Sequence, residues 1–127
     1  MINTGILNPR ILSLLARIRH TNALVISDRS FPFWPQIETV DISVVDDLPT
    51  VLQLIAVVRA NHNFTQACMA REFQKNNSAA TRASFAKALA GVPTKFEPHV
   101  DFKKRVPDAI GLIRTGDTTP YANVILI

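Results

Sequence analysis

The 127-residue sequence is poor in several residue types, and each shortage excludes a class of protein. Cys68 is the only cysteine, so the chain has no internal disulfide, which favours a reducing compartment. The four glycines form neither a Gly-x-Gly-x-x-Gly pattern nor a phosphate loop, which argues against a dinucleotide cofactor. Apolar runs such as residues 51–58 and 124–127 are far shorter than the roughly 20 residues that span a bilayer. We therefore expect no membrane span.

Signals for export, metal binding and nucleic-acid binding are also missing. Residues 1–5 lack the charge and the long apolar stretch of a secretory signal, so a cytoplasmic protein is expected. Cys68 and the three histidines have no paired spacing typical of a metal site. The net charge is +4, but apart from residues 103–105 the basic residues are scattered, whereas nucleic-acid binding needs a clustered basic face.

The composition is that of a folded globular chain. Hydrophobic residues make up 47% and charged residues 19%, which is unlike a disordered sequence. The length suits one domain, and neither a repeat nor a linker interrupts it. We predict a single domain over residues 1–127.

The first two elements are predicted from capping and periodicity. Asn8 can cap a helix that begins at Pro9, and one apolar face follows at helical spacing: Ile11, Leu14, Leu15 and Ile18. Residues 23–27 form a continuous apolar run that ends at Asp28, which is typical of a strand covered on both faces.

Helices and apolar strands then alternate along the chain. Strands are predicted at residues 39–42, 94–97, 109–114 and 123–127, and helices at residues 49–58, 78–90 and 100–106. Residues 64–73 are ambiguous, with strand preferred, and the proline- and aromatic-rich residues 29–35 form an irregular loop suited to lining a pocket. This order predicts an α/β fold, a three-layer α/β/α arrangement with a mixed, mostly parallel central sheet. Small ligands in such sheets bind beyond the strand ends.

Several short motifs resemble those of the ribose pyranase and fucose mutarotase family. Leu7-Asn8 precedes the first helix, His20-Thr21 follows it, and Asp28 ends the first strand. Near the end of the chain, Ile113 to Asp117 and Pro120-Tyr121-Ala122-Asn123 resemble the most distinctive segment of the family. The resemblance runs with few gaps over residues 5–127.

The resemblance implies an isomerase that interconverts ring or anomeric forms of a free monosaccharide without a cofactor. His20 would be the catalytic residue, because an imidazole near neutral pKa can both take and give a proton. The sugar would be bound by Asp28, His99, Tyr121 and Asn123. The resemblance also implies a homo-oligomer with the sugar site at a subunit boundary.

Other features leave the substrate and the activity open. His99 favours the ribose branch of the family, whereas Phe31-Pro32 is more like the fucose branch. Three residues depart from the family pattern: Arg19 replaces a Gly, Asn22 an Asp and Arg29 a small residue. These changes bring positive charge and point to an alternative, a non-catalytic protein that binds a sugar or a sugar phosphate. A purely structural oligomer is a third reading.

Taken without the resemblance, each candidate has a simpler interpretation. A lone histidine after a helix, such as His20, is more often a solvated or capping residue, and Asp28 is a common turn former. Tyr121 is equally acceptable as a half-buried strand residue, and His62, between two asparagines, is read as a turn residue.

Overall fold

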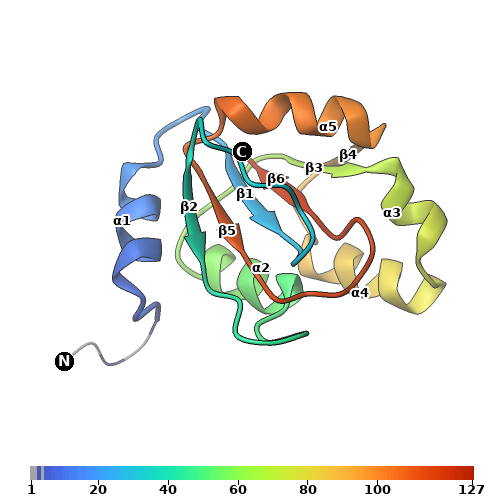
Figure 1. Ribbon diagram of the computed structural model, residues 1–127, viewed down its shortest axis with the longest axis horizontal. Helices are drawn as coiled ribbons and strands as arrows, with labels where there is room; N and C mark the ends of the chain where they lie inside the picture. The colour runs from blue at the N-terminus through green and yellow to red at the C-terminus, as the bar shows by residue number, and fades with distance from the viewer. Residues whose placement is uncertain (1–2, 4) are drawn as a thin grey trace.

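The computed structural model describes residues 3 and 5–127 (Figure 1). Its helices are α1 (Pro9–Arg17), α2 (Val51–Arg59), α3 (Arg71–Asn76), α4 (Ala79–Ala88) and α5 (His99–Arg105), followed by a 3-10 turn at Val106–Asp108. Its strands are β1 (Leu24–Ser27), β2 (Glu38–Asp41), β3 (Ala67–Ala70), β4 (Thr94–Glu97), β5 (Gly111–Arg114) and β6 (Val124–Leu126).

The six strands form one sheet in the order β2-β5-β1-β6-β3-β4. The pairs β2–β5, β5–β1 and β3–β4 are parallel, and β6 is antiparallel to both of its neighbours. The prediction of a mixed, mostly parallel sheet is therefore confirmed. Because β6 runs backwards beside β1, the residues before β6 lie next to the residues after β1.

Two hydrophobic cores cover the two faces of the sheet. Along β1, Leu24 and Ile26 belong to the core under α1, α2 and α4, whereas Val25 belongs to the core under α5. Neighbouring residues of a strand point to opposite faces, so a strand with both faces covered has to be apolar throughout. The three-layer α/β/α prediction is confirmed, with α5 on one side and α2 and α4 on the other (Figure 1).

The caps predicted at Asn8 and Ser78 are confirmed, whereas the second helix begins later than predicted and the last begins one residue earlier, at His99. The side chain of Asn8 accepts hydrogen bonds from the backbone of Arg10 and Ile11, and Ser78 accepts one from Thr81. Pro49, however, lies outside α2. Thr50 is the cap instead, and it exchanges side-chain and backbone hydrogen bonds with Gln53, which is a capping box.

The ambiguous segment at residues 64–73 is divided between two elements. Only Ala67–Ala70 are a strand, and Arg71 immediately begins α3. The strand pairs with β4 and β6 and has all four residues buried. Helix-favouring residues such as Ala and Met are therefore extended here because the sheet covers them, which is tertiary context overriding local propensity.

None of the helices in the described part of the chain is long and apolar enough to cross a membrane.

Candidate functional site

A pocket of about 350 Å³ opens where β1 ends. Its walls come from the residues after β1, from the loop between β5 and β6, and from the start of α5. Both β5 and β6 pair with β1. Segments almost a hundred residues apart in the sequence therefore meet beyond the C-terminal end of β1. The pocket is lined by four of the five predicted site residues, Asp28, His99, Tyr121 and Asn123.

Asn123 and Asp28 join the two sides of the pocket. Asn123 is buried, and its Oδ1 accepts a hydrogen bond from the backbone N–H of Asp28 at 2.8 Å. The register of β6 on β1 places Val124 opposite Ile26, so this contact follows from the strand pairing. Asn123 thereby fixes the backbone that carries the Asp28 carboxylate.

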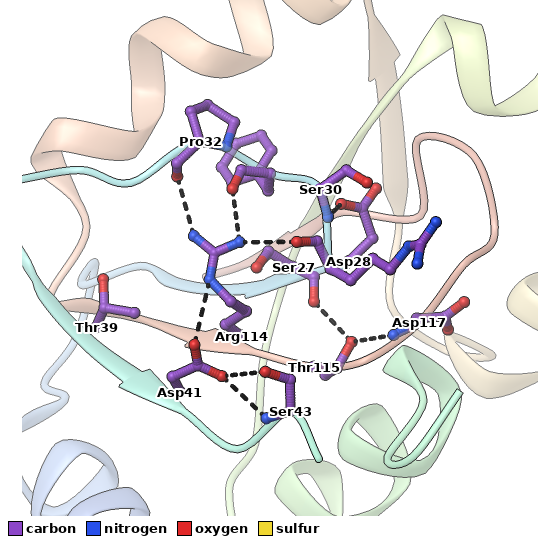
Figure 2. A network of polar contacts seen from close by, with 12 residues as sticks. Ser27, Asp28, Ser30, Pro32, Thr39, Asp41, Ser43, Arg114, Thr115 and Asp117 are labelled. Carbon is purple, nitrogen blue, oxygen red and sulfur yellow. Dashed lines mark hydrogen bonds and ion pairs between the residues drawn. The ribbon is translucent and has the colours of Figure 1, made fainter. Parts of the chain in front are cut away.

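The Asp28 carboxylate is held inside the pocket wall. Its Oδ1 accepts a hydrogen bond from the backbone N–H of Ser30 at 2.9 Å (Figure 2). Burial raises the pKa of Asp28 above its usual value, and the nearby Asp117 carboxyl adds to the rise, while hydrogen bonds from the Ser30, Phe31 and Asn123 amides oppose it. A poorly solvated carboxylate gains much from a hydroxyl donor, so Asp28 is suited to accept a sugar hydroxyl.

His99 is the first residue of α5, and its backbone N–H donates to the Glu72 carboxylate at 2.9 Å. Its ring stands edge-on to Tyr121, with the ring centroids 5.1 Å apart. On the protein side, Phe31 and Phe102 each lie 6.0 Å from it by ring centroid. These aromatic neighbours fix the orientation of the imidazole at the pocket.

The surroundings of His99 lower the pKa of its imidazole and so favour the neutral form. Burial is the main cause that lowers its pKa, with the Lys103 charge second, while Glu72 and Asp28 oppose the shift. Its Nδ1 is buried and has no hydrogen-bond partner within the described residues. A neutral imidazole has one donor and one acceptor nitrogen, so His99 can exchange hydrogen bonds with a hydroxylated ligand.

Tyr121 is presented by a turn that other residues hold in shape. Its backbone has a φ of 56°, which lies in the left-handed region that residues other than glycine rarely adopt. The Asn77 side chain donates to the Pro120 carbonyl at 2.9 Å and so fixes the residue before it. Strained backbone of this kind often marks a functional position.

Asp117 is a second carboxylate in the pocket wall; it ends the motif at residues 113–117 but was not predicted to be a site residue. It is buried, and its two oxygens accept hydrogen bonds from the backbone N–H groups of Val51 and Thr119, each at 2.8 Å. It therefore ties the Tyr121 loop to the first turn of α2. Acidic residues in turns are common, and the sequence held no signal that this one would be buried.

The loop at residues 29–35 lines the pocket through its first part only. Ser30, Phe31 and Pro32 face the pocket. Phe33 is 71% exposed, and Trp34 packs on Phe31 with a centroid distance of 5.9 Å. The loop thus contributes to the pocket as predicted, through Ser30, Phe31 and Pro32.

His20 does not lie in this pocket. It lines a smaller hollow of about 150 Å³ that also contains His62, and it precedes β1, whereas Asp28 follows it. The four strand residues between them alone span about 13 Å. Within one chain the structure therefore brings Asp28, His99, Tyr121 and Asn123 together and leaves His20 at the opposite edge of the sheet.

Two of the three departures from the family pattern have local structural roles. The Arg19 guanidinium donates to the carbonyl oxygens of Ala16 and Ile18 at 2.6 and 3.1 Å, which satisfies the end of α1. The Asn22 side chain accepts a hydrogen bond from the backbone N–H of Arg19 at 2.7 Å. Both residues close the turn that carries His20.

The third departure, Arg29, forms an ion pair with Asp46 and does not line the pocket. Its Nη1 lies 2.6 Å from Asp46 Oδ1 in an exposed ion pair. The described residues that line the pocket include the acidic Asp28 and Asp117 and neither lysine nor arginine. This arrangement suits an uncharged, hydroxylated ligand better than a phosphate.

Other features of the chain are less suited to a polar ligand. A pocket of about 400 Å³ beside α4 is lined mainly by apolar residues, including Met69, Phe73, Phe85, Leu89, Val92 and Phe96. In residues 3 and 5–127, no group of three or more His, Cys, Asp or Glu side chains is placed to hold a metal ion.

Comparison with known proteins matches this chain and its fold to one family. The model of the RbsD / FucU transport protein family matches residues 1–127. The chain belongs to this family. Among relatives in the family, a D-ribose pyranase of Laribacter hongkongensis is 35% identical over 126 residues, covering 99% of this chain and 95% of the relative. A D-ribose pyranase of Chromobacterium violaceum is 38% identical over 122 residues, covering 96% and 92%.

Two solved structures have the same architecture as this chain. Bacillus subtilis RbsD complexed with D-ribose superposes with a TM-score of 0.92 at 30% identity, covering 99% of this chain and 95% of that one. The fucose mutarotase of Streptococcus pneumoniae in complex with L-fucose superposes with a TM-score of 0.79 at 17% identity, covering 94% and 90%. At that identity the second likeness shows the fold alone.

Proposed function

We propose that the chain is an aldose mutarotase or pyranase that interconverts the ring or anomeric forms of a free, uncharged monosaccharide such as ribose. The observation that carries the proposal is the meeting of Asp28, His99, Tyr121 and Asn123 in one pocket. A volume of about 350 Å³ is at the lower end of the range for small-ligand sites. Relatives that match over nearly their whole length are D-ribose pyranases.

The reaction needs only proton transfers. A base takes the proton of the anomeric hydroxyl, the bond between the anomeric carbon and the ring oxygen breaks, and an acid protonates that oxygen. The open-chain aldehyde then closes again when a hydroxyl attacks either face of the carbonyl carbon, with the protons moving in reverse. Asp28 and the neutral His99 would hold hydroxyls, and His20 would carry the proton.

In this proposal His20 reaches the sugar from a second copy of the chain. His20 and the pocket lie at opposite ends of β1. One chain can therefore offer its pocket to one neighbouring subunit and its His20 to another. Two apolar residues that adjoin the pocket lining support a subunit boundary there, since Phe33 is 71% and Val100 is 58% exposed. The proposal is therefore a homo-oligomer in which two subunits share each site, and its expected location is the cytoplasm.

Exchange NMR on anomeric protons tests the activity. Added protein is expected to accelerate interconversion of ribose or fucose, and His20→Ala to lower the rate by a factor of about 10² to 10⁴, which is the usual contribution of a positioned acid or base. His62→Ala, a change in the same hollow, is the matched control and is expected to leave the rate near that of the wild type. No acceleration across a panel of aldoses would contradict the proposal.

Mixing two inactive variants tests the shared site. His20→Ala retains an intact pocket, whereas Asp28→Asn retains an intact His20. Refolded together in equal amounts, they are expected to regain about a quarter of the wild-type activity, because half of the pockets and half of the neighbouring histidines are intact in a symmetric assembly. A mixture no more active than its components would contradict a site that takes His20 and Asp28 from different chains.

A non-catalytic sugar-binding protein is the second candidate, and the separation of His20 from the pocket within one chain favours it. In that case ribose would raise the unfolding temperature by binding to the native state, with no acceleration of exchange. Ribose 5-phosphate serves as the comparison ligand. Since Arg29 is neutralised by Asp46 and the pocket wall is acidic, the neutral sugar is expected to bind more tightly.

A further inference from the structure

Arg114 lies beneath the pocket wall and gathers the backbone of the loop that forms it. Its Nη1 donates to the carbonyl oxygens of Arg29 at 3.2 Å and Phe31 at 2.6 Å, and its Nη2 donates to that of Pro32 at 3.3 Å. Figure 2 shows the guanidinium between this stretch of chain and Asp41. One side chain thus holds three carbonyls of four successive residues.

The sheet fixes where Arg114 stands. It is the last residue of β5, opposite Ser27 of β1 and Asp41 of β2. Its side chain is only 14% exposed, and its Nε lies 3.8 Å from Asp41 Oδ2. Asp41 in turn accepts a hydrogen bond from the backbone N–H of Ser43 at 3.0 Å. The sheet and Asp41 therefore orient the guanidinium independently of its contacts with the loop.

The same loop makes its other contacts on the opposite side. While its carbonyls point to Arg114, the Ser30 N–H points to the Asp28 carboxylate at 2.9 Å. Ser30, Phe31 and Pro32 line the pocket, and Arg114 does not. The loop is consequently held between a cation outside the pocket and the sugar-binding carboxylate within it.

We infer that Arg114 is a positioning residue for the monosaccharide site, which it shapes by holding the carbonyl groups of residues 29–32 so that the Ser30 amide and the Phe31 ring keep their places around Asp28. The expected change in KM rests on the proposed function, whereas the expected change in loop order does not. A planar guanidinium can bond several acceptors at fixed angles, whereas an ammonium is a single point of charge. A lysine at this position would therefore replace Arg114 only in part.

Kinetics on Arg114→Met and Arg114→Lys test the inference. In Arg114→Met the KM for ribose is expected to rise about tenfold, as for the loss of a charge-assisted hydrogen bond, with a much smaller change in kcat because the proton-carrying group is untouched. Arg114→Lys is expected to fall between Arg114→Met and the wild type. The matched control is Arg17→Met, which removes an arginine paired with Glu38 at the other end of β2 and is expected to keep the wild-type KM.

Two measurements do not depend on catalysis. Trp34 is the only tryptophan and packs on Phe31 of this loop, so acrylamide quenching of its fluorescence reports loop order. Quenching is expected to increase in Arg114→Met and to stay unchanged in Arg17→Met. Faster exchange of the Ser30 amide hydrogen is expected in the same variant, since a freed loop opens more often.

The outcomes separate the two proposals. If the wild type neither accelerates exchange nor binds ribose, the proposed function fails, and quenching and amide exchange still decide the role of Arg114. If the wild type is active and a folded Arg114→Met keeps its KM, its Trp34 quenching and its Ser30 exchange, the inference is overturned. If Arg114→Met does not fold, the same readings on Arg114→Lys decide, because that variant retains the positive charge beside Asp41.

Discussion

The side-chain oxygen of Asn123 lies 2.8 Å from the backbone nitrogen of Asp28, and both residues are buried where β1 and β6 meet. Among the hydrogen bonds of the described residues, this is the contact by which the residue just before β6 holds the backbone of Asp28 in place. The contact links the end of β1 to the start of β6, so its loss is expected to affect both the stability of the sheet and the shape of the pocket.

Replacing Asn123 by Leu is expected to destabilise the protein by about 1–3 kcal/mol, because the buried Asp28 N–H would lose its acceptor. Urea unfolding measures the change. Asn76→Ala is the control: Asn76 bonds the Glu72 carbonyl from an exposed position, and such surface changes are usually within about 0.5 kcal/mol. Equal losses in the two variants would contradict the role of Asn123.

Asp28→Asn is expected to weaken ribose binding and at the same time to raise thermal stability at pH 7. Because burial raises the pKa of Asp28 in the folded chain, ionisation there is disfavoured, and the folded protein loses stability as the pH rises through this pKa. The amide variant has no such loss, and its oxygen can still accept from Ser30. Its advantage should disappear below about pH 3.9, where the carboxyl is protonated even in the unfolded chain. Melting curves at pH 3.5 and 7 measure this, and an advantage of the same size at both values would contradict it.

The fold was largely predictable because its signals are local. Asn8 and Ser78 cap their helices as expected, and the unbroken apolar run before Asp28 indicated a strand covered on both faces. Prediction failed at two helix starts. Pro49 was placed inside a helix that begins after Thr50, and residues 71–73 belong to α3 although a strand was preferred there. The strand preference was correct for residues 67–70, which β4 and β6 flank.

The pocket residues could be predicted from family motifs more readily than from the chemistry and spacing of the residues alone. Asp28, His99, Tyr121 and Asn123 were named from their resemblance to a family, and strand order brings them together. Asp117 and Arg114 were not named as site residues, since the hydrogen bonds that define their roles reach segments 66 and 82–85 positions away. The separation of His20 from Asp28 follows from the strand predicted at residues 23–27, because that strand begins after His20 and ends before Asp28.

His99 is expected to make the stability of the wild type fall on acidification. Its pKa is lowered in the folded chain, chiefly by burial, so the unfolded chain takes up a proton at His99 more readily than the folded one. Stability from this group is therefore full above the unfolded pKa of about 6.5 and decreases as the pH falls below it. His99→Gln, which does not titrate, should lose less. Urea midpoints between pH 5 and 8 measure the difference, and parallel profiles for the two proteins would contradict it.

Cys68 is expected to resist thiol reagents until the protein unfolds. It lies buried on β3, and its Sγ donates to Glu97 Oε1 at 3.1 Å. Burial, together with the Glu97 carboxylate, raises the pKa of Cys68 to about 12, and the thiolate is the reactive form. At pH 8 and moderate reagent concentration, modification by iodoacetamide should be about a thousandfold slower in the native protein than in 8 M urea, because only the small open fraction reacts. A native rate close to the denatured one would show that β3 is accessible from the sheet edge at β4, and that the Cys68–Glu97 contact does not persist in solution.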